Sequence, residues 1–139
     1  MASNTAINTV DQAVISQGLI AAAREMGVKL VRSAYSPVVR EANDCSAALL
    51  DRHGNVVAQA ELIPMQLGPI GATFRPCADL FPTDTLVEGD FYINNDPFEG
   101  GQHLQEVQIL LVEGSGLQTV VHVQDALHLL THRAIGQDW

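Results

Sequence analysis

The sequence predicts an α+β fold, in which a long N-terminal helix packs on a mainly antiparallel sheet of two hairpins. Apolar residues recur at steps of three and four through residues 8–34, which is typical of an amphipathic helix. Farther along, two pairs of short apolar runs are each joined by turn-forming residues, which is typical of hairpins. The chain has 139 residues, of which 47% are hydrophobic, so residues 1–139 are expected to form a single N-terminal domain, or a fragment of a longer subunit.

Residues 8–34 form the predicted helix. Its apolar stripe comprises Ile15, Leu19, Ala22, Ala23, Met26 and Leu30. Asn8 or Thr9 can cap its first turn, because short polar side chains accept hydrogen bonds from free amides there. Pro37 should end the helix near residues 35–36, because the residue before a proline avoids helical geometry.

The first predicted hairpin pairs residues 45–50 with residues 56–60 across a polar turn that contains Gly54. Both strands are nearly all apolar, so we expect both to be buried on their two faces. The second hairpin pairs residues 106–112 with residues 117–123.

A stretch rich in proline and glycine separates the two hairpins. Within it we expect a short helix at 71–80, a strand at 91–94 and a turn-rich loop at 96–101. The expected core comprises Leu19, Met26, Leu30, Leu49, Val57, Ile93, Ile109, Leu111 and Val121.

The charge of the chain excludes several classes of partner. Sixteen acidic residues against seven Lys and Arg give a net charge of −9, which argues against nucleic-acid binding, since phosphate contacts need basic side chains. No apolar run approaches the roughly 20 residues that span a bilayer, so we expect no membrane association. The absence of a leader-like start and of a disulfide framework favours a cytoplasmic location.

Acidic residues dominate the second half of the chain. Between Arg75 and Arg133 there are nine Asp and Glu residues and no Lys or Arg. Acidic side chains without basic neighbours must face water, meet a basic partner or hold a cation.

A metal site is one interpretation of residues 94–106. This segment contains a Gly pair, and His103 and Glu106 lie three residues apart. On a strand the two side chains would face opposite sides, whereas in a bend they can converge on Zn, Mn or Fe(II).

Three further features offer ligands or nucleophiles. His128 and His132 lie four apart, so they share a face on a helix or on a strand. Asp44 stands before the first hairpin, either as a turn former or as a ligand. Cys45 is a nucleophile or, as we favour, a buried structural thiol. The chain has no GxxxxGK[ST] motif for binding ATP.

Several motifs, in order, resemble the hydantoinase B/oxoprolinase family over about residues 12–113. Segments within residues 24–37 resemble its first helix, and residues 44–54 resemble its acid-containing hairpin. Residues 63–68 are similar to its IPxHLG segment, and residues 89–104 to its GDxxxxNDPYxGGTHLPD signature.

The resemblance implies the metal-dependent hydrolytic subunit of an ATP-dependent cyclic amide hydrolase, acting on hydantoins, 5-oxoproline or lactams. In this family ATP is bound by an A-type subunit, which phosphorylates the substrate. The B-type subunit then acts on that intermediate, so the assembly is a hetero-oligomer. The alternatives are a ketone carboxylase subunit of the same family and a non-catalytic fragment that serves as an assembly module. Because B-type subunits are several times longer, we expect the isolated chain to be inactive without its partner and the remaining chain.

The resemblance also implies a set of site residues. Asp44, His103 and Glu106 match the family's catalytic acids and histidine. With His128 they would hold a divalent metal, Zn or Mn, and His132 is the alternative fourth ligand.

The signature loop contributes Asp96, Gly100 and Gly101 as the expected cofactor-binding residues. Asp96 would either shape the loop or support the metal ligands from behind. The chain departs from the family pattern at Gln66, where many members carry His, and at Glu106, where Asp is usual.

Overall fold

The structure, a computed structural model, describes residues 7–60, 62–63, 68, 70–87, 89–100, 106–112 and 118–124. Its helices are α1 (Thr9–Ser33), α2 (Pro37–Ala42) and α3 (Ile70–Leu80), with a 3-10 turn, η2 (Thr83–Thr85). Its strands are β1 (Cys45–Leu50), β2 (Val56–Gln59), β3 (Phe91–Asn94), β4 (Glu106–Val112) and β5 (Gln118–Gln124). All five strands form one antiparallel sheet in the order β2-β1-β5-β4-β3.

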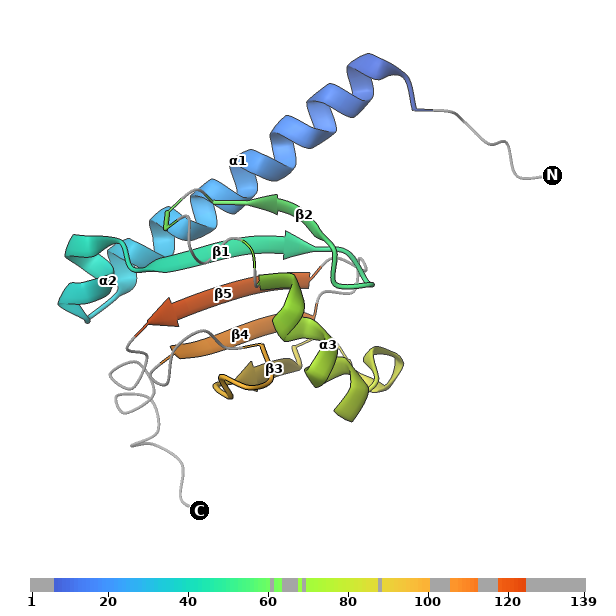
Figure 1. Cartoon of the computed structure of the whole chain (residues 1–139). Helices are drawn as coiled ribbons and strands as arrows, with labels where there is room; N and C mark the ends of the chain where they lie inside the picture. Colours follow the sequence, from blue (N-terminus) through green and yellow to red (C-terminus); the bar gives the residue numbers. More distant parts are fainter. Residues whose placement is uncertain are drawn as a thin grey trace.

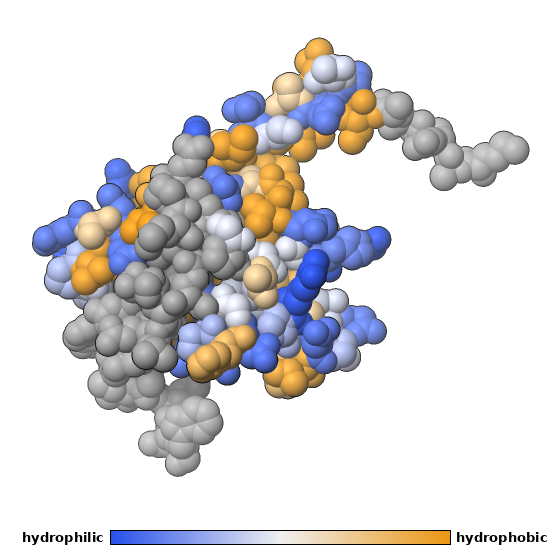
Figure 2. Space-filling model, viewed as in Figure 1, coloured by the Kyte–Doolittle hydropathy of each residue, from blue (hydrophilic) through white to orange (hydrophobic). Residues whose placement is uncertain are grey.

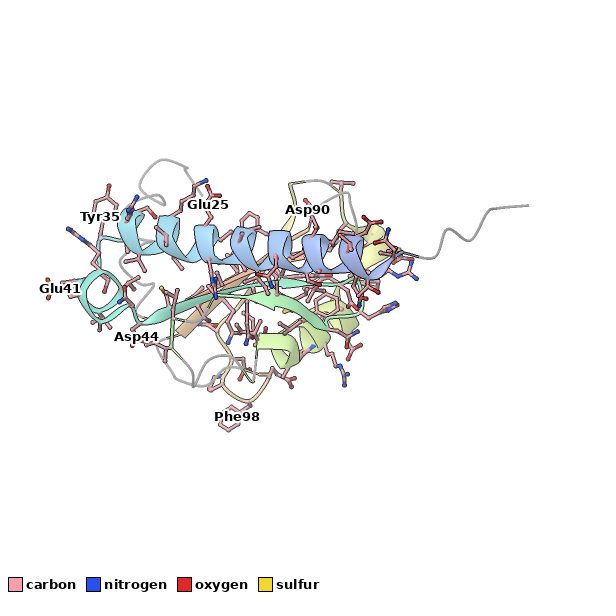
Figure 3. The ribbon with its side chains drawn as sticks, turned by 90° about the horizontal axis from the view of Figure 1, so that it is seen from above. Glu25, Tyr35, Glu41, Asp44, Asp90 and Phe98 are labelled. Atoms are coloured by element: carbon pink, nitrogen blue, oxygen red, sulfur yellow. The ribbon has the colours of Figure 1, made fainter. Side chains whose placement is uncertain are left out.

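Helices α1 and α3 lie on opposite sides of this sheet (Figures 1 and 3). Strand β1 separates two clusters, because successive side chains of a strand point to opposite faces. Leu49 packs with Ala23 of α1, whereas Leu50 packs with Ile70 and Phe74 of α3. The predicted α+β class and its long N-terminal helix are confirmed, and the two predicted hairpins join into one sheet.

Helix α1 is capped as predicted by Asn8, whose Oδ1 accepts a hydrogen bond of 2.8 Å from the Asp11 amide. From Leu19 onward the helix packs on the sheet, through Leu19 and Met26, while its N-terminal turns project beyond β2 (Figure 1). Apolar and hydrophilic side chains are mixed on that projecting part (Figure 2). Ile15, predicted to belong to the buried stripe, is 50% exposed, because no strand lies beneath it.

Pro37 does more than end α1. The helix ends at Ser33, and Pro37 begins the separate helix α2. Proline suits a first helical position, because its missing amide would lack a partner there and its φ is already helical. The sequence analysis did not predict this second helix.

The prediction that both strands of the first hairpin are buried on both faces holds for β1 and is wrong for β2. Every residue of β1 is buried, because it lies inside the sheet between α1 and α3. Val57, an expected core residue, is 43% exposed on the edge strand β2. Ile93, another expected core residue, is 50% exposed on the opposite edge strand, β3. Edge strands have a single neighbour, so less of their surface is covered.

The described helices include no segment that is both long and apolar enough to cross a bilayer. This finding agrees with the absence of a long apolar run in the sequence.

Candidate functional site

Two of the predicted site residues, Asp44 and Glu106, lie at the same end of the sheet. Cys45 pairs with Val123 at the beginning of β1, and Glu106 pairs with Gln124 at the beginning of β4. Asp44 directly precedes β1, so it lies two strands away from Glu106, with β5 between them. At the usual strand spacing the outer two strand axes are about 10 Å apart.

Asp44 is placed by the end of α2. Asn43 adopts the left-handed conformation with φ of 54°, which ends the helix and turns the chain into β1. The Asp44 amide donates to the Val38 carbonyl at 3.3 Å, and the Cys45 amide donates to the Asn43 carbonyl at 2.8 Å. These contacts hold the half-buried Asp44 at the edge of the molecule beside α2 (Figure 3).

Cys45 is completely buried next to this carboxylate. Burial, reinforced by the negative charge of Asp44, raises the pKa of the Cys45 thiol to about 11. A thiol with this pKa is almost entirely protonated at neutral pH, and a protonated thiol is a poor nucleophile. The structure thus favours a structural thiol over a catalytic one.

The signature loop after β3 is built by its own polar groups. The Asp96 amide donates to Asn94 Oδ1 at 2.9 Å, and Asp96 Oδ1 accepts from the Phe98 amide at 2.8 Å. Asn94 Nδ2 then donates to the Glu99 carbonyl at 2.8 Å. The carboxylate of Asp96 therefore shapes the loop, and its predicted part in cofactor binding stays a prediction. At its tip Phe98 is 93% exposed and points away from the molecule (Figure 3).

Gly100 fixes the loop against α3. Its φ is +95°, and a Cβ at this position would lie 2.9 Å from Thr73 Cα and 3.0 Å from the Ala72 carbonyl oxygen. The Ala72 carbonyl lacks its usual helical hydrogen bond, because the residue four positions later is Pro76, which has no amide hydrogen. The loop backbone passes closest to α3 at this place. Only glycine combines this conformation with this proximity.

Two buried polar residues were missed by the sequence analysis. Ser46 of β1 is 0% exposed and Gln108 of β4 is 1% exposed, and Ser46 Oγ and Gln108 Oε1 have no hydrogen-bond partner within the described structure. In the register both pair with His122 of β5. They lie two residues inward from Asp44 and Glu106. The signal in the sequence was a single polar residue inside each apolar strand.

Several predicted residues lie outside the described residues, namely Gln66, Gly101, His103, His128 and His132. Of Glu106 only the backbone position is described. The described residues contain no group of three His, Cys, Asp or Glu side chains placed to hold a metal. The proposed ligand set therefore remains a prediction.

Comparison with known proteins identifies relatives of this chain. The sequence model of the hydantoinase B/oxoprolinase family matches residues 8–124. The B-type subunit of a putative D-/L-hydantoinase from a Pseudomonas species is 32% identical, with 73% of this chain and 18% of that protein aligned. A 5-oxoprolinase from Saccharomyces cerevisiae is 33% identical over 75% of this chain and 8% of its own length. The beta subunit of caprolactamase from Pseudomonas jessenii is 36% identical over 70% of this chain and 17% of its own length.

Two solved structures share the fold. An ATP-dependent caprolactamase from Pseudomonas jessenii superposes with a TM-score of 0.65 at 24% identity, covering 84% of this chain and 21% of that chain. A nucleotide-free acetone carboxylase superposes with a TM-score of 0.68 at 17% identity, covering 81% and 16%. The chain thus spans less than a fifth of the length of the named sequence relatives.

Proposed function

The chain belongs to the hydantoinase B/oxoprolinase family, and on this premise we propose that it is part of the hydrolytic subunit of an ATP-dependent cyclic amide hydrolase. The observation that carries the proposal is the family match together with the strand register, which brings Asp44 and Glu106 to one end of the sheet. In the sequence, His103 comes three residues before the start of β4, and His128 comes four residues after the end of β5. Both strand ends lie at this same end of the sheet.

The donor set fits a divalent metal. Two carboxylates and two neutral imidazoles are ligands typical of Zn and Mn. Asp44, His103, Glu106 and His128 would hold the ion, and His132 is the alternative to His128. A divalent ion held there supplies Lewis acidity, which lowers the pKa of water and polarises a carbonyl oxygen.

The protein's own residues have supporting roles in this proposal. Asp96 holds the signature loop together and Gly100 lies against α3, and His103 follows this loop three residues later in the sequence. Ser46 and Gln108 lie next to the acidic end of the sheet, with hydrogen-bonding capacity that the described residues leave unused. We assign them as positioning residues, because an unused buried oxygen can fix the orientation of a neighbouring polar group.

ATP would be bound by an A-type partner, which phosphorylates the cyclic amide, and not by this chain. Two of the sequence relatives are named as subunits, which supports a hetero-oligomer. Three sequence relatives above 30% identity favour amide hydrolysis over ketone carboxylation, because they are named as a hydantoinase subunit, a 5-oxoprolinase and a caprolactamase subunit. The acetone carboxylase, at 17% identity, supports the fold alone.

The metal assignment is tested by elemental analysis of the purified 139-residue chain after incubation with Zn or Mn and removal of free ions. We expect about one ion per chain, and loss of most of that metal in Asp44→Asn and His103→Ala. Asp84→Asn is the matched control, because Asp84 is an exposed acid on η2. Circular dichroism must show that each variant keeps its secondary structure.

Either of two results would contradict the assignment. The wild-type chain could hold no metal, or both folded ligand variants could keep the wild-type metal content.

A further inference from the structure

An open groove lies beside the edge strand β3 and the end of α3. Its volume is about 730 Å³, within the range of protein binding sites. All four residues of β3 line it, although their side chains alternate between the two faces of the sheet. The groove therefore lies alongside the whole length of β3. β3 is the last strand in the sheet order, with β4 as its single partner among the described strands (Figure 1).

The walls of the groove are apolar and partly exposed. They come from the last turns of α3 and from the segment that follows it, including Leu80, Phe81 and Leu86. Leu80 is 75% exposed and Phe81 is 61% exposed, so these walls face solvent in the described structure. The hydroxyl of Tyr92 donates to the Phe81 carbonyl at 2.6 Å, which holds this wall close to β3.

The charge of the groove has one sign. Asp79, Asp90, Asp96 and Glu99 line it, and the described lining residues include no Lys, Arg or His. Asp90 and Asp96 accept hydrogen bonds from backbone amides, whereas the carboxylates of Asp79 and Glu99 make no hydrogen bond or ion pair within the described residues. The last turn of α3 has no basic residue, so the partial negative charge at the helix end adds to that of Asp79.

The negative charge of the groove makes it an unsuitable binding site for the intermediate of the proposed reaction. A phosphorylated intermediate is an anion, and four carboxylates would repel it. A cationic occupant is complementary to these charges.

We propose that this groove binds an extended, lysine- or arginine-bearing segment of a partner polypeptide, which adds to the sheet as a neighbour of β3. Backbone amides and carbonyls of an unpaired edge strand are a template for such addition. Apolar side chains of the segment would pack on Phe81 and Leu86, while its basic side chains would meet Asp79 and Glu99. The inference does not rest on the proposed enzymatic function.

The test uses the 139-residue chain and a fluorescent, end-blocked octapeptide of alternating Lys and Val. A matched octapeptide of alternating Glu and Val is the probe of opposite charge. We expect saturable binding of the Lys peptide, at least about tenfold tighter than that of the Glu peptide at low salt and weaker as salt increases. Hydrogen exchange of the Phe91–Asn94 amides should slow when the Lys peptide is bound.

Variants distinguish the groove from the general negative charge of the protein. Asp79→Asn combined with Glu99→Gln should weaken binding of the Lys peptide at least about fivefold. Glu25→Gln combined with Glu41→Gln removes the same charge from exposed positions on α1 and α2 (Figure 3) and should change binding less than twofold.

Equal losses in the two double variants would overturn the proposal, because they would indicate non-specific attraction. Binding without slower exchange in β3, or equal binding of both peptides, would also overturn it.

Discussion

Side chains on β1 show how burial sets chemical behaviour. Cys45 lies inside the sheet, where the charged form of a thiol is poorly solvated, and Asp44 adds a repulsive charge. Ser46, the next residue, is buried on the opposite face with an unused hydroxyl. Both residues reduce the stability of the folded state. The effect of Cys45 depends on pH, because its thiol titrates, whereas the effect of the Ser46 hydroxyl does not.

The Cys45 thiol predicts a loss of stability at alkaline pH. Its pKa is raised from 9.0 to about 11 by folding, so above pH 9 the unfolded chain loses the proton while the folded chain keeps it. Stability falls with increasing pH wherever the unfolded state binds fewer protons. Urea unfolding should therefore give a lower free energy of unfolding at pH 10.5 than at pH 8.

Cys45→Ala is the comparison for this prediction. The fall between the two pH values should become smaller in this variant, although not zero, because burial also raises the pKa of Cys77. An unchanged fall would mean that Cys45 does not titrate differently in the two states.

Removal of the Ser46 hydroxyl should stabilise the protein. A buried polar atom without a partner costs about 1 kcal/mol or more, so Ser46→Ala should raise the free energy of unfolding by about 1 kcal/mol. Urea unfolding at pH 7 measures this change. A destabilised variant would show instead that the hydroxyl has a hydrogen-bond partner in solution.

Helix α3 is held between two glycine-containing loops. Gly54, in the turn between β1 and β2, has a φ of +81° and lies against the ring of Phe74. Gly100, in the loop after β3, lies against Ala72 and Thr73. Phe74 also meets Tyr92 of β3 edge to face, with ring centroids 6.5 Å apart. These contacts connect α3 to both edges of the sheet. Through Gly100 they also connect α3 to the loop that follows β3.

Gly100→Ala should loosen this arrangement. A methyl group there would meet the α3 backbone at a φ that L-residues rarely adopt, so the free energy of unfolding should decrease by about 2 kcal/mol. Gly18→Ala is the matched control, because Gly18 lies in α1 with nothing within 4 Å of the added Cβ. That substitution should raise stability by up to about 1 kcal/mol. Similar effects of both substitutions, measured by urea unfolding, would contradict the packing role of Gly100.

The sheet as a whole is completed by a pairing of distant segments. β1 and β4 have β5 as their common neighbour, although β1 and β5 are separated by most of the second half of the chain. In the hydrogen-bonded sheet, β3 and β4 are connected to β1 and β2 through β5, while Val107 of β4 also packs in one core cluster with Cys45 of β1.

A chain that ends at residue 112 should therefore lose cooperative folding. Without β5, the buried strands β1 and β4 lack a hydrogen-bonding neighbour, and unpaired buried backbone groups are costly. Thermal unfolding followed by circular dichroism should show one sharp transition for the 139-residue chain and none for residues 1–112. A sharp transition in the shorter chain would show that its hairpin and helices fold independently of β5.

The local elements can be predicted from the amino-acid sequence, because their signals come from neighbouring residues. The cap at Asn8, the apolar run of β1 and the turn residues around Gly54 each specify a conformation through nearby atoms. The family and its fold class also followed from motifs in the sequence. Asp44, Asp96 and Gly100 were identified in the same way, and the structure shows how the loop uses the last two.

Which strands are neighbours in the sheet becomes known from the folded structure alone, and the exposure of each strand depends on its neighbours. Val57 and Ile93 look like core residues in the sequence, yet they lie on the two edge strands. Strand order also explains why the polar atoms of Ser46 and Gln108 are buried and why the acidic groove lies beside β3. Strand order joins segments far apart in the chain, and no pattern of neighbouring residues encodes it.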